Sequence, residues 1–277
     1  MRTIVHLSDI HFGRVDEGLI SPLLETVEEL KPDLVAVSGD LTQRGRSAQF
    51  RAAREFLDNL PKPQIIVPGN HDVPLYNVYA RFFTPLDNYR RYITDDLWPM
   101  FVDDEMVVVG VNTARSLTFK GGRINETQIA WLRERLCRVD DRVVKVIVSH
   151  HPFDVPEGRD ERELVGRARL AIAAIAECGA DLLLSGHLHL SHTGNTASRY
   201  RISGYSALIV QAGTATSTRG RGEVNSFNVL YLDHPTIVVK RMLWQRERGL
   251  FGLASTESFN HTPDGWVRVE DASHGAR

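Results

Sequence analysis

The stretch Gly186-His187-Leu188-His189 follows an apolar run, Leu182-Leu183-Leu184, that is typical of a buried strand. Two histidines separated by one residue, on the loop where a strand ends, can point into one cleft from two directions. Taken alone this is a weak signal, because many His-x-His pairs are simply surface histidines. Its meaning depends on whether other strands end in the same kind of residue.

Four other segments carry metal-ligand residues at the same position, directly after a predicted strand. They are Asp9-Ile10-His11, Gly39-Asp40, Gly69-Asn70-His71-Asp72 and Ser149-His150-His151. Each residue taken singly has an ordinary explanation as a helix cap, a turn or a loop residue. Five such strand ends are hard to explain by chance, and in open α/β sheets ligands bind outside the carboxyl ends of the strands. We therefore expect the five segments to form one site.

The chain alternates strands with helices as far as residue 184. Strands are expected at 3–7, 34–37, 65–67, 106–111, 143–148 and 182–184, and helices at about 21–30, 47–60, 125–136 and 164–178. Three later runs, 205–211, 227–232 and 236–244, are expected to be strands without helices between them. This order predicts an α/β protein with parallel strands covered by helices, followed by a second sheet or an extended sheet edge.

Residues 73–100 interrupt this alternation with many aromatic residues and several arginines between them. We expect short helices or a long loop there. The segment is interpreted either as a lid or substrate-pocket insertion, or as aromatic side chains packed on the core, since loops of this length are uncommon and often functional. From about Arg246 the alternating pattern weakens.

Composition narrows the functional classes. The 277 residues are 25% charged and 42% hydrophobic, with a net charge of -2. This balance gives no basic surface of the kind expected for binding duplex nucleic acid. Cys137 and Cys178 are expected in helices without a disulfide framework, which fits a reducing compartment. Without a signal peptide or a membrane-spanning run, we expect a cytoplasmic, soluble protein, and contact with a membrane surface stays open.

The candidate ligands are oxygen and nitrogen donors without a thiolate, which suits Mn, Fe, Zn, Co or Mg. They are Asp9, His11, Asp40, Asn70, His150, His187 and His189. The Asp40 carboxylate has two oxygens and can bridge two ions, so that each ion receives four protein ligands. Two ions about 3.5–4 Å apart can generate hydroxide at neutral pH and clamp the oxygens of an in-line displacement at phosphorus.

These motifs, in this order, resemble those of the calcineurin-like metallophosphoesterases over roughly residues 2–245. The fuller forms, from Leu7 to Phe12, Ser38 to Thr42 and Val67 to Asp72, look most like the class III cyclic nucleotide phosphodiesterase branch. The resemblance implies a four-layer αββα sandwich with two mixed sheets flanked by helices. It also implies a metallophosphoesterase domain over 1–245, and it leaves 246–277 as a partly irregular C-terminal extension.

The same resemblance implies a division of labour within the site. One of two divalent or mixed-valence ions is expected on Asp9, His11, Asp40 and His189, and the other on Asp40, Asn70, His150 and His187. His71 is expected to contact the phosphate and either stabilise the transition state or protonate the leaving group, with Asp72 orienting it. Arg44, Arg115, His151 and His192 are further candidates for substrate contact, and Arg219 also flanks a cleft loop.

The resulting hypothesis is a binuclear metal-dependent phosphodiesterase in which a metal-bridging hydroxide attacks a small phosphodiester, with a cyclic nucleotide as one candidate. One alternative keeps this chemistry but takes a nucleotide-sugar lipid pyrophosphate or a glycerophosphodiester as substrate. A DNA nuclease is a second alternative, which the acidic isoelectric point of about 6.6 disfavours. A metal-free binding scaffold is a third, and it would be expected to lack some of the ligands.

Overall fold

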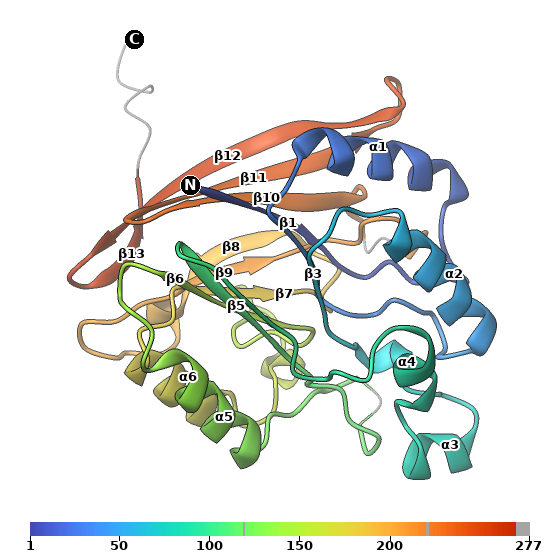
Figure 1. The fold of residues 1–277 in the computed structure, drawn as a ribbon, viewed down its shortest axis with the longest axis horizontal. Helices are drawn as coiled ribbons and strands as arrows, with labels where there is room; N and C mark the ends of the chain where they lie inside the picture. The colour runs from blue at the N-terminus through green and yellow to red at the C-terminus, as the bar shows by residue number, and fades with distance from the viewer. Residues whose placement is uncertain (119, 220–221, 270–277) are drawn as a thin grey trace.

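The computed structural model describes residues 1–118, 120–219 and 222–269, and it contains two β-sheets packed face to face (Figure 1). The seven-stranded sheet has the order β13-β12-β11-β10-β1-β2-β3. Its strands are β1 (Arg2–Leu7), β2 (Leu34–Val37), β3 (Gln64–Ile66), β10 (Ser226–Asp233), β11 (Thr236–Gln245), β12 (Leu250–Thr262) and β13 (Gly265–Arg268). β1, β2 and β3 run parallel, and the remaining neighbours pair antiparallel.

The six-stranded sheet has the order β4-β5-β6-β7-β9-β8. Its strands are β4 (Met100–Val102), β5 (Met106–Val111), β6 (Val144–Ser149), β7 (Leu182–Ser185), β8 (His192–Asn195) and β9 (Leu208–Gln211). The four central strands are parallel, while β4 and β8 run antiparallel at the two edges. Both sheets are therefore mixed.

Helices cover the outer face of each sheet. They are α1 (Ile20–Leu30), α2 (Ser47–Asp58), α3 (Val78–Phe83), α4 (Asp87–Tyr92), α5 (Glu126–Leu136) and α6 (Ala168–Glu177), with short 3-10 turns at Glu17–Leu19, Asn70–Asp72, Glu161–Glu163 and Thr196–Ser198. In Figure 1, α5 and α6 lie on the side of the molecule opposite α1 and α2.

Three apolar layers hold these elements together. The layer between the sheets joins side chains such as Ala36 of β2 and Val146 of β6. A second layer lies under α1, α2 and α4, and a third under α5 and α6. The central strands are buried on both faces, which explains why they have continuous apolar sequences. The predicted four-layer αββα sandwich is confirmed.

The 73–100 segment divides into a packed part and an exposed part. Tyr89 of α4 is fully buried and its hydroxyl donates to the Ile66 carbonyl at 3.0 Å. On α3, by contrast, Tyr79 and Phe83 are 69% and 73% exposed and stack on each other. Packing on the core thus accounts for α4 but not for α3, and a lid role for this segment stays a prediction.

The chain after β11 is more regular than the sequence indicates. Residues 250–262 and 265–268 form β12 and β13 and extend the seven-stranded sheet, so the predicted boundary at residue 245 falls between two paired strands. β12 gives a weak sequence signal because many of its side chains, including Ser255 and Glu257, are polar. The prediction for 270–277 lies outside the described residues.

The prediction that the cysteines form no disulfide is wrong. Cys137, which follows α5, is bonded to Cys178, which follows α6. The two helices pack side by side on the same sheet, and this brings together two cysteines that are 41 residues apart in the sequence. Because the two cysteines are bonded to each other, they do not indicate a reducing compartment. Among the described residues, every helix is too short or too polar to cross a bilayer.

Candidate metal centre

The predicted ligands lie together where strands of both sheets end. β1 leads to Asp9 and His11, and its parallel neighbour β2 leads to Asp40. In the other sheet the parallel neighbours β6 and β7 lead to His150 and to the His187 loop. Because parallel neighbours present their carboxyl ends at one edge of a sheet, packing the two sheets face to face brings these loops into one cluster.

Among the described non-glycine residues, a left-handed backbone occurs at several of these ligands and, outside the cluster, at Lys31 and Arg167. Five of the predicted ligands have a left-handed backbone, at φ values between 52° and 72°: Asp9, His11, Asp40, His187 and His189. In that region the chain turns sharply directly after the strand, and Asp and His adopt it more readily than most residues. The turn lets residues that are two positions apart face the same point.

One half of the cluster consists of Asp9, His11 and His189. The Nε2 atoms of His11 and His189 lie 3.2 Å apart, and Asp9 Oδ1 lies 3.3 Å from His189 Nε2. Asp40 Oδ2 completes this half at 3.7 Å from His11 Nε2. All of these side chains are at most 4% exposed.

The other half gathers around His150. Its Nε2 lies 3.4 Å from Asp40 Oδ2 and 3.1 Å from Asn70 Oδ1. Its Nδ1 donates to the Ser38 carbonyl at 2.8 Å, which leaves Nε2 as the atom directed at the cluster. Asp40 Oδ2 therefore faces both halves, while its Oδ1 accepts a hydrogen bond from the His71 backbone N–H at 2.8 Å.

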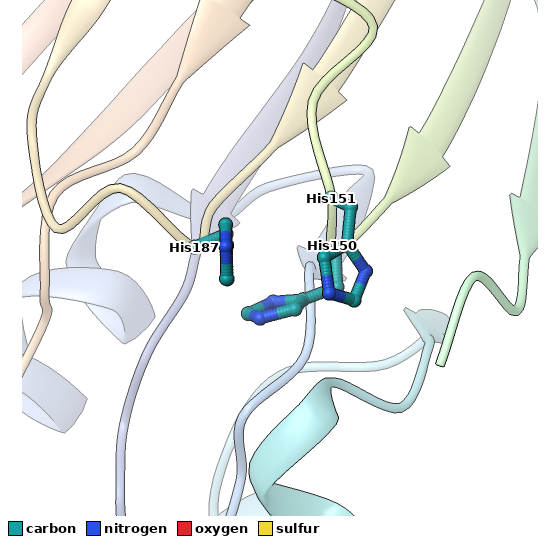
Figure 2. A group of neighbouring side chains, drawn as sticks. All are labelled: His150, His151 and His187. Carbon is teal, nitrogen blue, oxygen red and sulfur yellow. The ribbon is translucent and has the colours of Figure 1, made fainter. Parts of the chain in front are cut away.

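Figure 2 shows His187 approaching His150 and His151 from the end of β7. The three rings are close enough for their nitrogens to share an ion. His151, however, uses both ring nitrogens within the protein: Nε2 donates to the Lys120 carbonyl at 3.0 Å, and Nδ1 lies 2.8 Å from the Thr113 hydroxyl. His150 and His187 therefore suit ligation, whereas His151 holds the loop that contains Lys120.

The electrostatics of the cluster favour a bound cation. Burial alone would raise the pKa of Asp9, but the neighbouring His189 and His11 hold this pKa well below its ordinary value. Burial alone would lower the pKa of His150, yet the Asp40 carboxylate raises it to about 9. Asp9 Oδ1 is buried without a hydrogen-bond donor. Buried carboxylates surrounded by imidazole nitrogens that can act as metal ligands are suited to binding divalent ions.

Asp72 supports the cluster in a way that differs from the predicted one. Its carboxylate accepts hydrogen bonds from the backbone N–H groups of Gly69 at 2.9 Å and Thr42 at 2.8 Å. The Nδ1 atom of the His71 ring lies 2.9 Å from the Gln43 carbonyl. Asp72 thus joins the loop after β3 to the loop after β2, and Gln43 orients His71.

A cavity of about 480 Å³ opens above the cluster. It is lined by predicted site residues together with several that the sequence does not single out. The lining residues are Asp40, Asn70, His71, Lys120, Gly121, Asp160, Arg162, Glu163, His187, His189 and Arg219. Lys120, Asp160 and Arg162 belong to polar loops without a motif, so only the three-dimensional arrangement identifies them.

The other predicted substrate contacts lie away from this cavity. Arg44 packs over the Tyr76 ring and lines a separate pocket between α2 and α3. Arg115 donates to the Ala114 carbonyl at 2.8 Å and to Gln128 Oε1 at 2.6 Å at the start of α5. His192 begins the edge strand β8. Among these candidates, Arg219 reaches the cavity and lies beside His71.

Comparison with known proteins places the chain in a family. The family model described as calcineurin-like phosphoesterase matches residues 2–191. A probable glycerophosphodiester phosphodiesterase GpdQ of Arcobacter nitrofigilis is 27% identical, over 67% of this chain and 71% of that protein. The 3',5'-cyclic adenosine monophosphate phosphodiesterase CpdA of Escherichia coli is 25% identical, over 67% of this chain and 69% of that protein.

One further relative and one solved structure extend the comparison over more of the chain. A cAMP/cGMP dual specificity phosphodiesterase of Mycobacterium tuberculosis is 27% identical, over 85% of this chain and 77% of that protein. The crystal structure of a dimetal phosphatase from Danio rerio superposes with a TM-score of 0.67 and is 16% identical in sequence. The match covers 94% of this chain and 99% of that chain. This last likeness concerns the fold. The chain belongs to the calcineurin-like phosphoesterase family.

Proposed function

We propose that this protein hydrolyses phosphodiesters at a centre that would hold two divalent ions, with Asp40 contributing a ligand to each. The position of Asp40 Oδ2, which faces His11 on one side and His150 on the other, carries this proposal. One ion would be held by Asp9, His11, Asp40 and His189, and the other by Asp40, Asn70, His150 and His187. Two divalent ions there would supply Lewis acidity for a displacement at phosphorus.

His71 would serve the leaving group. Its Nε2 lies 3.0 Å from Arg219 Nη1, which can only donate a hydrogen bond, and its Nδ1 lies 2.9 Å from the Gln43 carbonyl, so the neutral ring carries its proton on Nδ1. Nε2 then faces the cavity as an acceptor. Burial lowers the pKa of His71, so a proton taken up on Nε2 after Arg219 turns to the substrate would pass easily to a departing alkoxide.

The substrate proposed is a small phosphodiester, as the names of the relatives indicate: glycerophosphodiesters or cyclic nucleotides. The lining of the cavity suits a polar alcohol group, because Lys120, Asp160 and Arg162 can hydrogen-bond to hydroxyl groups. The exposed aromatic residues of α3 favour a second candidate, a lipid-linked phosphodiester or pyrophosphate whose apolar part would lie against that helix.

Turnover under saturating Mn²⁺ tests these proposals. Wild-type protein is expected to hydrolyse bis(p-nitrophenyl) phosphate, and parallel assays with cyclic AMP, a glycerophosphodiester and UDP-diacylglucosamine would identify the substrate class. Asp40→Asn and His187→Ala are expected to lose most of this activity together with bound metal. Unchanged activity in either variant would show that the ligand assignment is wrong.

A further inference from the structure

Residues 212–219, called here the threonine strap, lie along the Asp9 and His11 loop. The Thr214 hydroxyl donates to the Asp9 carbonyl at 2.6 Å, and the Thr216 hydroxyl donates to the Ile10 carbonyl at 3.0 Å. The Thr218 N–H donates to the Arg14 carbonyl at 2.8 Å. The strap is thus hydrogen-bonded along its length to the loop that carries the first predicted ligands.

The strap is an integral part of the fold. Thr214 and Thr216 are 2% and 0% exposed, so their hydroxyls cannot exchange these bonds for water. The Thr216 carbonyl also accepts from the Asp16 N–H at 2.9 Å, which adds a bond in the opposite direction. A segment held from both sides has a fixed position relative to the candidate metal centre.

Arg219 is the last residue of the strap, and its Nη1 lies 3.0 Å from His71 Nε2. A guanidinium can only donate, so Nε2 accepts this bond and the proton of neutral His71 lies on Nδ1, which faces the Gln43 carbonyl. A guanidinium has five N–H donors, and this bond uses one of them. Both side chains line the cavity above Asp40, so the other donors are available at the point where a phosphoryl group would lie.

We propose that Arg219 binds a non-bridging oxygen of the substrate phosphoryl group, and that the threonine strap holds it in position for this contact. The inference rests on the proposed function, since it names a substrate contact of that site. A planar guanidinium matches phosphate oxygens in a way that a lysine ammonium does not. In the free protein Arg219 also donates a hydrogen bond to the His71 ring. The residue proposed to bind the phosphate therefore also contacts His71, the candidate general acid.

Kinetics and phosphate binding by Mn²⁺-loaded variants test this proposal. Arg219→Ala is expected to lower kcat/KM for bis(p-nitrophenyl) phosphate by about 100-fold, the scale seen when one donor to a reacting oxyanion is removed. Calorimetric affinity for inorganic phosphate should fall about tenfold, since an Arg–phosphate hydrogen bond is charge-assisted. Arg219→Lys should recover part of both losses. The metal content should stay at the wild-type level.

Two measurements separate a contact from a merely structural role. The ¹⁵N resonance of His71 Nε2 should shift in Arg219→Ala, because its hydrogen-bond donor is lost. Thr216→Val should weaken phosphate binding, while Thr216→Ser, which keeps the hydroxyl, should restore it. Arg142→Ala, at an exposed arginine that precedes β6 whereas the site follows it, is the matched control and should leave the kinetics unchanged.

The two proposals fail in different ways. Wild-type kinetics and phosphate affinity in Arg219→Ala would overturn the role of Arg219, and so would loss of bound metal from that variant. If the wild type hydrolyses no phosphodiester, the proposed function fails. The phosphate affinities of the wild type and Arg219→Ala still decide whether Arg219 binds the anion.

Discussion

Replacing Gly186 should damage the candidate site without removing a ligand. A Cβ at this position would lie 1.8 Å from Ser8 Oγ and 2.5 Å from Asp9 Oδ2. Ordinary van der Waals contact begins at 3.4 Å, so the Ser8 hydroxyl would have to move by about 1.6 Å. That hydroxyl donates to Asp9 Oδ2 at 2.8 Å, and Asp9 would be displaced with it.

Both stability and activity should respond. Overpacking of a tightly packed interior costs about 1–3 kcal/mol, and we expect Gly186→Ala to lose this much free energy of unfolding. A displacement of about 1 Å at a reacting group costs about 100-fold in rate, so kcat for bis(p-nitrophenyl) phosphate should fall on that scale. Affinity for Mn²⁺ should fall as well, because Asp9 is a proposed ligand.

Urea unfolding, metal analysis of the purified protein and steady-state kinetics would measure these effects. Gly18→Ala is the matched control: Gly18 is exposed in a 3-10 turn, and its Cβ would approach only the Asp16 side chain, at 3.3 Å. Ser8→Ala combined with Gly186→Ala should recover part of the loss, since the closest clashing atom is then absent. Wild-type metal affinity and kcat in Gly186→Ala would refute the reasoning.

Further predictions concern His150, His151 and Trp266. His150→Ala should lose bound Mn²⁺. His151→Ala should retain it and change mainly KM, because both nitrogens of the His151 ring bond within the protein. Equal metal loss in the two variants, measured by mass spectrometry, would contradict this prediction. In the metal-free protein the pKa of His150 is about 9, so Mn²⁺ must displace a proton from this side chain when it binds. Calorimetry of Mn²⁺ binding in two buffers at pH 7.5 should therefore show about one proton released from His150. The same raised pKa stabilises the folded metal-free protein below about pH 6.5. The free energy of unfolding in urea should lose this contribution as the pH rises towards 9. An affinity for Mn²⁺ that does not change with pH would contradict both the proton release and this loss of stability. Trp266→Phe removes the indole N–H that donates to buried Asp181 at 2.9 Å, and it should lower the free energy of unfolding in urea by about 1–3 kcal/mol. The value of kcat should not change, because Asp181 precedes β7 whereas the site follows this strand. A loss of kcat would contradict this prediction.

The fold is predictable from the sequence where strands are buried on both faces. Runs such as Leu182–Leu184 or Val107–Val109 are apolar throughout because the sheets are covered on both sides. The edge strand β8 and the long β12 give no such signal, since many of the side chains in both strands are polar. The Cys137–Cys178 bond depends on how α5 and α6 pack against each other, which local sequence does not specify.

The candidate site is predictable to a similar degree and for a related reason. Ligands at strand ends appear in the sequence as Asp and His directly after apolar runs. Contacts between loops do not appear in this way. That Asp72 joins two loops, that His151 holds the Lys120 carbonyl, and that Arg219 reaches His71 all depend on segments brought together by the sandwich.

The left-handed backbone at five proposed ligands has a consequence for how such a protein can be stabilised. A non-glycine residue in this conformation costs about 1 kcal/mol or more, so the five together amount to a sizeable part of the net stability of a domain. Glycine would relieve this cost at each position while deleting a ligand. Selection for stability and selection for metal binding therefore act in opposite directions on the same residues. A thermostability screen without an activity assay would be expected to enrich glycine at these residues and yield robust proteins without catalytic function.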